Sequence, residues 1–381
     1  MAIAHLSRQP ALIPRRTFLR LAASVATAAA GGCGALPRSA VVVEPRRHFA
    51  RVKVSPERII RTVVGLRPFR PSGFVVRPDK IDEKTVIHNY GHGGGGMTLS
   101  WGTSHLAVER AGETGHAEFA VLGCGGVGLA TARLLQRRGY RVTIYAKDLP
   151  PNTTSNIAGA QWSPAEVYDA DHQTPTFTDQ FVRAAHLSQR EYQNLVGDYY
   201  GVRWIENYVI SEQPFQRPQG TGQGIADLYP DAHDVPPNDH PFGKGVYVRR
   251  FTTMLIEPPV YLNAVLRDFL MAGGKLVVRE LADRPAIAAL PEPVVMNCTG
   301  LGAKGLFGDE ELMPIKGQLT ILLPQPEVDY ITITDVLYMF PRRDGILLGG
   351  THERGVWTLE PNLEAAQRIL EGHAQFFGRM A

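Results

Sequence analysis

Phe119-Ala120-Val121-Leu122-Gly123-Cys124-Gly125-Gly126-Val127-Gly128 is the stretch that decides the fold. Its four apolar residues predict a short buried strand, and the glycines that follow have the spacing G-x-G-x-x-G. Residues 127–138 continue with helical spacing and end at Gly139, and residues 141–145 have the pattern of a second strand. Strand, glycine turn, helix and strand, in this order, predict a βαβ unit that binds a dinucleotide.

The glycines of this turn have separate tasks. Gly123 permits the tight turn, Gly125 lets the backbone approach a pyrophosphate, and Gly128 lets the helix pack closely on the sheet. The helix begins at the ligand, where its unpaired amides and partial positive charge favour phosphate groups. A carboxylate near the end of the second strand would hold the ribose hydroxyls, and Asp148 is the candidate.

Segments downstream of the turn narrow the class of dinucleotide. Residues 152–155 (Asn-Thr-Thr-Ser), 158–159 (Ala-Gly) and 162–164 (Trp-Ser-Pro) resemble the segment that contacts the pyrophosphate and the flavin in the D-amino-acid oxidase family. Residues 294–300 (Val-Val-Met-Asn-Cys-Thr-Gly) are similar to the strand of that family that ends in Asn-Cys-Thr-Gly. The resemblance implies FAD as the cofactor and argues against a nicotinamide-dependent dehydrogenase.

The most distinctive segments of that family stand upstream of the turn. Residues 87–98 (Ile-His-Asn-Tyr-Gly-His-Gly-Gly-Gly-Gly-Met-Thr), followed by Trp101-Gly102, resemble its glycine-rich block, and residues 65–71 (Gly-Leu-Arg-Pro-Phe-Arg-Pro) resemble its arginine motif. In the family both segments lie near the C-terminus. Residues 348–357 of this chain are similar to what normally precedes the arginine motif. The resemblance therefore implies a circularly permuted chain, with its break between about residue 380 and residue 55.

A permutation at this place is physically reasonable. Residues 86–90 are expected to form a strand, residues 95–110 a helix of roughly 24 Å, and residues 119–122 the next strand. A helix of that length returns the chain to the start of a parallel neighbour. The predicted fold class is therefore α/β, circularly permuted, with a Rossmann-like parallel sheet for FAD and a mixed or antiparallel sheet in the substrate lobe.

The resemblance also implies how a substrate is held. Arg67 aligns with the arginine that pairs bidentately with the substrate carboxylate, and Tyr338 aligns with the tyrosine whose hydroxyl meets the same group. The Gly94 carbonyl would accept the substrate amine, and the α-hydrogen would leave as hydride to the flavin without a protein base. Thr334 stands where the mammalian enzyme has a second tyrosine, on a lid. His92 is expected to be structural rather than catalytic.

The residues expected to contact FAD come from several separate segments. They are Gly93, Gly94, Gly95, Gly96, Met97, Thr98, Gly123, Gly125, Gly126, Val127, Gly128, Asp148, Thr153, Thr154, Ala158, Gly159 and Thr299. The family usually carries a side chain where Gly95 stands, so the stiffness of that turn is open. The three cysteines show no metal or disulfide spacing, and Cys124 and Cys298 are expected to be buried and inert.

The activity implied by the resemblance is oxidative deamination of a D-amino acid to a 2-oxo acid, ammonia and hydrogen peroxide. Acidic D-amino acids are one option, because residues 348–357 are similar to the same stretch of D-aspartate oxidases and His352 or Arg354 could meet a second carboxylate. The alternatives are an oxidase of glycine or N-methyl amino acids, a dehydrogenase that passes electrons to an acceptor other than oxygen, and a non-catalytic exported flavoprotein.

The N-terminal end predicts a targeting segment. Residues 15–33 place Arg15 and Arg16 before a short Ala-rich run, which is typical of a signal peptide and resembles a twin-arginine export motif. Residues 30–33 (Ala-Gly-Gly-Cys) resemble a lipoprotein site, where Cys33 would carry a lipid anchor. The protein is therefore expected to be exported to the periplasm or cell surface.

Charge and length agree with this division of the chain. The net charge is +3, and residues 1–80 hold 15 Lys or Arg against 3 Asp or Glu. Part of this positive charge belongs to the predicted targeting segment, so it does not indicate a nucleic-acid partner. No apolar run is long enough to span a bilayer. The expected organisation is a signal peptide (1–33), a linker (34–50), the permuted C-terminal segment of the fold (51–118), and the FAD-binding core with the substrate lobe (119–381).

Overall fold

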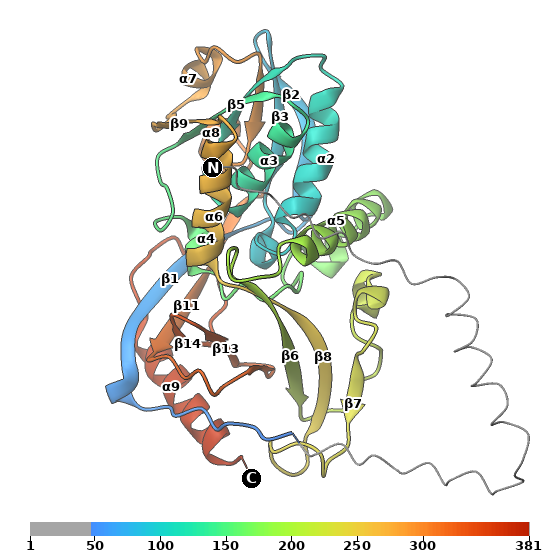
Figure 1. Ribbon diagram of the computed structural model, residues 1–381, viewed down its shortest axis with the longest axis vertical. Coiled ribbons are helices and arrows are strands. Elements are labelled where there is room, and N and C mark those ends of the chain that lie inside the picture. The colour runs from blue at the N-terminus through green and yellow to red at the C-terminus, as the bar shows by residue number, and fades with distance from the viewer. Residues whose placement is uncertain (1–46, 381) are drawn as a thin grey trace, which may run out of the picture. The chain divides into compact units, whose positions relative to one another are not determined.

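The structure is a computed structural model, and it describes residues 47–380. The predicted signal peptide and residues 34–46 of the predicted linker lie outside the described residues. The described chain forms two lobes, each built on one β-sheet (Figure 1).

The upper lobe in Figure 1 contains a six-stranded sheet with the order β2-β3-β10-β4-β5-β9. Its parallel strands are β3 (Lys84–Tyr90), β10 (Val294–Asn297), β4 (Glu118–Leu122), β5 (Arg141–Ala146) and β9 (Lys275–Val278). The strand β2 (Val75–Ile81) pairs with β3 in the antiparallel sense at one edge. The helix α3 (Gly126–Arg137) connects β4 to β5, so the predicted βαβ unit is present with its bounds within one residue or so.

A second strand–helix–strand unit precedes this one, and it differs from the prediction in two ways. The helix α2 (Ser100–Gly112) begins five residues later than expected, because residues 93–95 form a 3-10 turn in which Gly93 has a positive φ of 54°. The strands β3 and β4 are not direct neighbours, because β10 lies between them and pairs with both. The two strand–helix–strand units are therefore joined by β10, which follows them in the sequence by about 150 residues or more.

The lower lobe contains a nine-stranded sheet with the order β1-β11-β14-β13-β12-β6-β8-β7, and β15 pairs with β11. The strands are β1 (Ile59–Phe69), β6 (Val202–Ser211), β7 (His233–Val235), β8 (Tyr247–Ile256), β11 (Met313–Leu322), β12 (Tyr330–Ile333), β13 (Tyr338–Arg342), β14 (Gly345–Gly349) and β15 (Glu353–Arg354). All pairs are antiparallel except β12 with β6. The sheet is mixed, as predicted for the substrate lobe.

Helices complete both lobes. They are α4 (Thr154–Ile157), α5 (Pro175–Asn194), α6 (Pro258–Met271), α7 (Arg284–Ala288), α8 (Gly302–Phe307) and α9 (Leu363–Gly378). The helix α5 begins where the Thr174 hydroxyl accepts the Phe177 amide and Pro175 fixes the first turn. Trp101 on α2 is fully buried, and its indole N–H donates to the Tyr261 hydroxyl at 2.6 Å, which ties α2 to α6.

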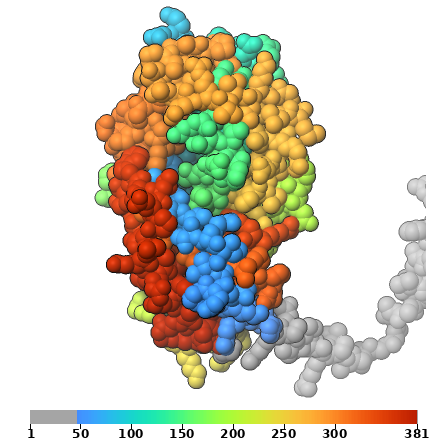
Figure 2. All heavy atoms as spheres, turned by 90° about the vertical axis from the view of Figure 1, so that its left-hand side faces the viewer, coloured from blue at the N-terminus to red at the C-terminus, as the bar shows by residue number. Residues whose placement is uncertain are grey.

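The two ends of the described chain lie side by side. The Arg51 guanidinium donates to the Met380 carbonyl, and the Tyr330 hydroxyl donates to the Ala50 carbonyl at 2.8 Å. The Phe49 ring packs edge-on against Tyr330. The packed fold therefore includes the last residues of the expected linker, and the red and blue ends of the chain meet on the face shown in Figure 2. None of the helices within residues 47–380 has the length and apolar character to cross a membrane.

Candidate active site

A cavity of about 1070 Å³ takes its walls from both sheets. Ligand pockets commonly measure roughly 300–1,000 Å³, so this cavity can hold a large cofactor together with a small substrate. One part of its wall is the glycine turn after β4, and another part is the side chains of Arg67 and Tyr338.

The glycine turn presents backbone rather than side chains to the cavity. Gly123 has a φ of +106°, a conformation that favours glycine. A Cβ atom on Gly128 would lie 2.1 Å from the Gly123 carbonyl oxygen, so a side chain there would push α3 off the turn. Gly125 precedes the helix with no side-chain cap, and the Gly126 amide donates to the Ser155 hydroxyl at 2.9 Å. The helix N-terminus is thus directed at the cavity, as binding of a pyrophosphate requires.

The carboxyl ends of the parallel strands supply the next part of the wall. Asp148 is exposed on the cavity wall two residues after β5. Arg279 and Glu280, which follow β9, line the same edge, and the Glu280 carboxylate lies 3.6 Å from the Lys147 ammonium group. Sequence analysis did not connect these residues with the dinucleotide. Since ligands of such sheets bind at the carboxyl ends of the strands, the parallel position of β9 was the missing information.

All but one of the residues expected to contact FAD line this cavity. The exception is Gly95, which faces the protein interior: a Cβ atom there would lie 2.6 Å from the Val167 side chain. The Val167 side chain fills the space that a side chain at position 95 would need.

Two buried amide groups on the cavity wall also point to a ligand. Asn89 and Gln161 are almost completely buried, and the Asn89 Oδ1 and Gln161 Nε2 atoms have no hydrogen-bond partner among the described residues. Buried polar atoms normally have partners, so unpaired ones on residues that line a cavity are consistent with a polar ligand there. Together with the open helix N-terminus, these groups fit a flavin dinucleotide.

The side chains expected to hold the substrate carboxylate lie over two glycines. Arg67 is on β1 and Tyr338 is on β13. A Cβ atom on Gly317 of β11 would lie 2.4 Å from the Arg67 Nη2 atom, and one on Gly349 of β14 would lie 2.0 Å from the Tyr338 ring. Sequence analysis missed both glycines, because their role depends on the register of the sheet. Burial raises the pKa of the Tyr338 hydroxyl, against the nearby positive charge of Arg67, so this hydroxyl remains a hydrogen-bond donor.

Arg67 already has a carboxylate partner within the protein. Its Nη1 atom forms an ion pair with Glu166 Oε2, and its Nη2 atom is 3.4 Å from the Thr351 carbonyl oxygen. The other oxygen of Glu166 is 2.8 Å from His352 Nδ1. Glu166 was not among the predicted site residues, because nothing in its local sequence places it beside Arg67.

The turn that contains Gly94 is tied to Glu166 through the backbone. The Gly94 amide donates to the Glu166 carbonyl at 2.9 Å, and a Cβ atom on Gly93 would lie 2.1 Å from that carbonyl oxygen. Glu166 itself has a φ of +53°, which is uncommon for a residue other than glycine. A residue keeps such an unfavourable conformation only where the surrounding structure fixes it. Residues of this kind are frequent at ligand-binding sites.

The segment that would correspond to a lid is short. The strands β12 and β13 are joined by residues 334–337 alone. The Thr334 hydroxyl accepts the Leu337 amide at 2.9 Å, and the Thr334 amide donates to the Leu337 carbonyl at 2.7 Å. This connection is a closed turn, so Thr334 stands in a tight turn rather than on a lid.

The two residues considered for a second substrate carboxylate differ in position. His352 lines the cavity, whereas Arg354 does not. Arg354 instead pairs with Asp169, at 2.8 Å for one of the two contacts, and its guanidinium lies 4.6 Å above the Phe69 ring. Arg354 therefore ties β15 to the loop that contains Asp169 and is not available to a substrate in the cavity.

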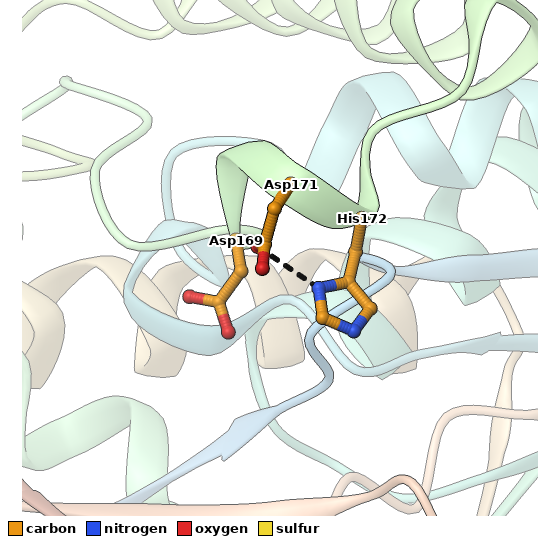
Figure 3. Close-up of side chains that lie close together, drawn as sticks. All are labelled: Asp169, Asp171 and His172. Carbon is orange, nitrogen blue, oxygen red and sulfur yellow. Dashed lines mark hydrogen bonds and ion pairs between the residues drawn. The ribbon is translucent and has the colours of Figure 1, made fainter.

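Asp169 also belongs to a group with Asp171 and His172, whose candidate ligand atoms lie within 4.8 Å of one another. Figure 3 shows the Asp171 carboxylate directed at the His172 ring, at 3.0 Å. Asp169 is engaged by Arg354, and the other two side chains are exposed. These contacts are ordinary surface ion pairs.

His92 and the two cysteines of the described chain do not change their protonation state near neutral pH. The His92 ring stacks on Phe74, and its Nε2 atom is 2.9 Å from the Thr103 hydroxyl. Burial lowers the pKa of His92 to about 3, so the ring is neutral. Burial raises the pKa of the Cys124 and Cys298 thiols to about 12, so both are protonated. Cys124 is buried as expected, whereas the Cys298 residue is only partly buried and lines the cavity.

A dinucleotide turn and an arginine–tyrosine pair on one cavity define a nucleotide-dependent oxidoreductase with two lobes. The family model of the FAD dependent oxidoreductases (DAO) matches residues 27–110 and 118–380, so the chain belongs to this family. The protein is an FAD-dependent oxidoreductase of the D-amino-acid oxidase type, and its cofactor is FAD.

Relatives and solved structures agree with this assignment. The chain is 30% identical over 258 residues to a D-amino-acid oxidase of Streptomyces coelicolor, covering 66% of this chain and 75% of that protein. It is 30% identical over 261 residues to human D-aspartate oxidase, covering 67% and 74%. Glycine oxidase of Bacillus cereus has the same fold at 15% identity, with a TM-score of 0.50 over 68% of this chain and 77% of that one. An L-α-glycerophosphate oxidase of Mycoplasma pneumoniae gives a TM-score of 0.51 at 13% identity over 69% and 79%.

Proposed function

We propose that the protein oxidises D-amino acids to 2-oxo acids and ammonia and passes the electrons to oxygen, which becomes hydrogen peroxide. The observation that carries the proposal is that Arg67 and Tyr338 converge on the cavity that the dinucleotide turn also lines. A guanidinium beside a protonated phenol is a binding site for a carboxylate. The relatives named D-amino-acid oxidase and D-aspartate oxidase support the amino-acid substrate and its configuration.

The residues of the chain bind and orient the substrate. The Arg67 guanidinium and the Tyr338 hydroxyl donate to the carboxylate, and the Gly94 carbonyl accepts an N–H of the amine. These contacts fix two of the four substituents of the α-carbon. FAD, when bound, accepts the α-hydrogen as hydride, and the resulting imino acid hydrolyses to the oxo acid. With these two substituents fixed, only one enantiomer would direct its α-hydrogen towards the part of the cavity that the dinucleotide turn lines.

The proposed activity is tested by the absorption spectrum of the purified protein. Under anaerobic conditions, D-alanine and D-aspartate should bleach the flavin absorption, whereas their L enantiomers and glycine should leave it unchanged or act far more slowly. Comparing D-alanine with D-aspartate measures whether His352 favours a second carboxylate. Equal bleaching by D and L enantiomers would remove the proposed stereochemistry, and bleaching by glycine alone would indicate a glycine oxidase.

We also propose that the chain is a circular permutation of its family. Three observations support this. The family model matches the chain in two separate segments, divided just before the dinucleotide turn. The matched relatives cover about two thirds of the chain, which is the share of residues 119–380. The ends of the described chain, at Arg51 and Met380, are in direct contact, as joining them in a non-permuted relative would require.

The permutation can be tested by reversing it. A variant that starts at residue 118, continues to residue 380 and is joined by a short Gly-Ser linker to residues 51–117 should fold, bind FAD and keep the activity. The control is the same chain without residues 51–117, which lacks β1 and β3 and should not bind FAD. If the control binds FAD as tightly as the full chain, residues 51–117 are an appendage and the permutation is refuted.

We further propose that the N-terminal segment exports the folded protein through the twin-arginine route, with a lipid anchor at Cys33. The support is the sequence pattern alone. Replacing Arg15 and Arg16 by Lys should retain the protein in the cytoplasm, since the receptor of this route reads the arginine pair. Cys33→Ala should release the exported protein from the membrane fraction. Unchanged export of the double variant would exclude the route.

A further inference from the structure

Glu166 occupies the position on Arg67 that a substrate carboxylate needs. The side chains of Arg67 and Glu166 are 20% and 39% exposed, so their ion pair faces the cavity and remains accessible to a ligand. A partly exposed pair of this kind contributes little stability, so a ligand can replace it at little cost. A substrate that binds Arg67 through its carboxylate must displace Glu166 from the guanidinium.

The displaced carboxylate has a second site within reach, next to Gly94. A Cβ atom on Gly94 would lie 3.3 Å from Glu166 Oε2, so the carboxylate borders the same backbone that is proposed to accept the substrate amine. The Gly94 amide is held by the Glu166 carbonyl, which fixes the distance between the two residues. His352 Nδ1, at 2.8 Å, holds the other oxygen of Glu166 when Arg67 is withdrawn.

The internal pair is the electrostatic complement of an amino acid. An α-amino acid carries a carboxylate and an ammonium group on one carbon, and Arg67 and Glu166 present the opposite charges side by side. When this zwitterion enters, both charged side chains exchange one partner for another. A carboxylic acid without an amine competes with Glu166 for Arg67 and gives Glu166 no new partner, so it binds less favourably than an amino acid.

We propose that Glu166 is a specificity-determining residue that binds the substrate ammonium group and excludes carboxylates that lack one. The proposal rests on the proposed oxidation of amino acids and extends it: Arg67 selects the carboxylate, and Glu166 selects the amine. It predicts opposite effects of one substitution on two ligands, whereas a merely structural role would weaken both.

The test uses the FAD-loaded protein and two ligands with the same carbon skeleton, D-alanine and propionate, which is D-alanine without its amine. Glu166→Gln removes the charge and keeps the size of the side chain. We expect propionate, followed by the shift it causes in the flavin absorption, to bind about tenfold more tightly, because Arg67 is no longer neutralised. We expect kcat/KM for D-alanine to fall about tenfold, because the ammonium group has lost its partner. The preference for D-alanine over propionate should therefore fall about a hundredfold.

Two further variants complete the experiment. Glu166→Asp keeps the charge on a shorter side chain, so it should lower kcat/KM for D-alanine without tightening propionate. Asp171→Asn is the matched control, since it removes one acid close by in sequence whose carboxylate contacts His172 rather than Arg67. This control should leave both ligands unchanged. Flavin absorption per protein shows whether each variant has kept its fold.

The outcomes separate this proposal from the proposed function. If Glu166→Gln changes the affinities for the two ligands by less than threefold, or in the same direction, Glu166 does not select the amine. If the wild-type protein oxidises no D-amino acid, the proposed function fails, and the binding of D-alanine is then read from the flavin absorption as for propionate. If Glu166→Gln does not retain FAD, Glu166→Asp decides: tighter binding of propionate by this variant would overturn the proposal.

Discussion

The two parts of the cavity are lined by different groups: backbone in one part and side chains in the other. Around Gly123 and Gly128 the wall is backbone, and the positions of a carbonyl and a helix N-terminus decide what can bind. Around Arg67, Glu166 and Tyr338 the wall consists of charged and polar side chains, which we propose exchange partners with the substrate. The difference implies two kinds of sensitivity. Changes at the dinucleotide turn should abolish cofactor binding, whereas changes at the substrate side should alter kinetics in graded steps and leave the cofactor in place.

The largest effect is expected for Gly128→Val. Its Cβ atom would lie 2.1 Å from the Gly123 carbonyl oxygen, and backbone on both sides leaves α3 no choice but to shift. Overpacking of this kind costs about 1–3 kcal/mol or more, and here it also misplaces the amides that face the phosphates. The purified variant should contain no FAD, measured as flavin absorption per protein. Gly222→Ala, where no atom lies within 4 Å of the added Cβ, is the control and should bind FAD fully.

Arg67→Leu should affect the substrate and spare the cofactor. Loss of a charge-assisted pair inside a site costs about 3 kcal/mol, so kcat/KM should fall roughly a hundredfold and KM should rise. Arg67→Lys should recover part of this loss, because a point charge cannot form two parallel hydrogen bonds. Steady-state kinetics with D-alanine and the flavin content are the measurements. Loss of FAD from Arg67→Leu would contradict the separation of the two parts of the cavity.

A smaller effect, on stability, is expected from His92, which lies on the cavity wall next to the Gly93–Gly94 turn. Its pKa is about 3 in the folded protein and about 6.5 in the unfolded chain, so acid protonates the unfolded state first. The neutral ring therefore contributes stability that is complete above pH ~6.5 and is lost as the pH falls towards 3. Between pH 6.5 and pH 5 the loss is about 2 kcal/mol.

His92→Gln should remove this part of the acid sensitivity, because glutamine can meet Thr103 but takes up no proton. The free energy of unfolding, measured with denaturant at several pH values, is the test. The curves of the variant and of the wild type should approach each other as the pH falls. Parallel curves would show that His92 is protonated in the folded protein.

The smallest effect is expected for Tyr338→Phe. The ring still packs over Gly349, and only the hydroxyl that donates to the substrate carboxylate is lost. One such hydrogen bond is worth about 1 kcal/mol, so kcat/KM should fall about fivefold with the FAD content unchanged. Tyr200→Phe is a control that removes a hydroxyl outside the cavity, where it donates to Asp268 at 2.7 Å. A larger loss than that of Arg67→Leu would reverse the assigned roles.

The same difference explains what the sequence could predict. The dinucleotide turn is six consecutive residues, 123–128, whose spacing contains its geometry, and it was predicted almost to the residue. The substrate side is assembled from β1, the segment after α4, β13 and the loop before β15. Family resemblance identified Arg67 and Tyr338, but Glu166 could not be found, because its place depends on a positive φ and on a contact 99 residues away in sequence.

Errors in the secondary structure have a related cause. The helix after residue 95 was expected to begin within the glycine run, but residues 93–95 form a 3-10 turn and residues 96–99 a further turn, so α2 begins at Ser100. The insertion of β10 between β3 and β4 was not predicted either, since strand order is set by pairing across the whole chain. Local patterns predicted the type of the elements around the dinucleotide turn, whereas the neighbours of each strand depend on long-range pairing.

The pairing of β1 with β11 bears on how the protein is made. The two strands are separated by about 250 residues, and the ribosome releases β1 first. At a synthesis rate of roughly 5–20 residues per second, β1 remains unpaired for on the order of 10–50 s before β11 has been made. The strand β3 waits similarly for β10 in the other lobe. Neither lobe can therefore complete its β-sheet until the last third of the chain has emerged. Until then the nascent chain exposes unpaired strands, to which chaperones can bind.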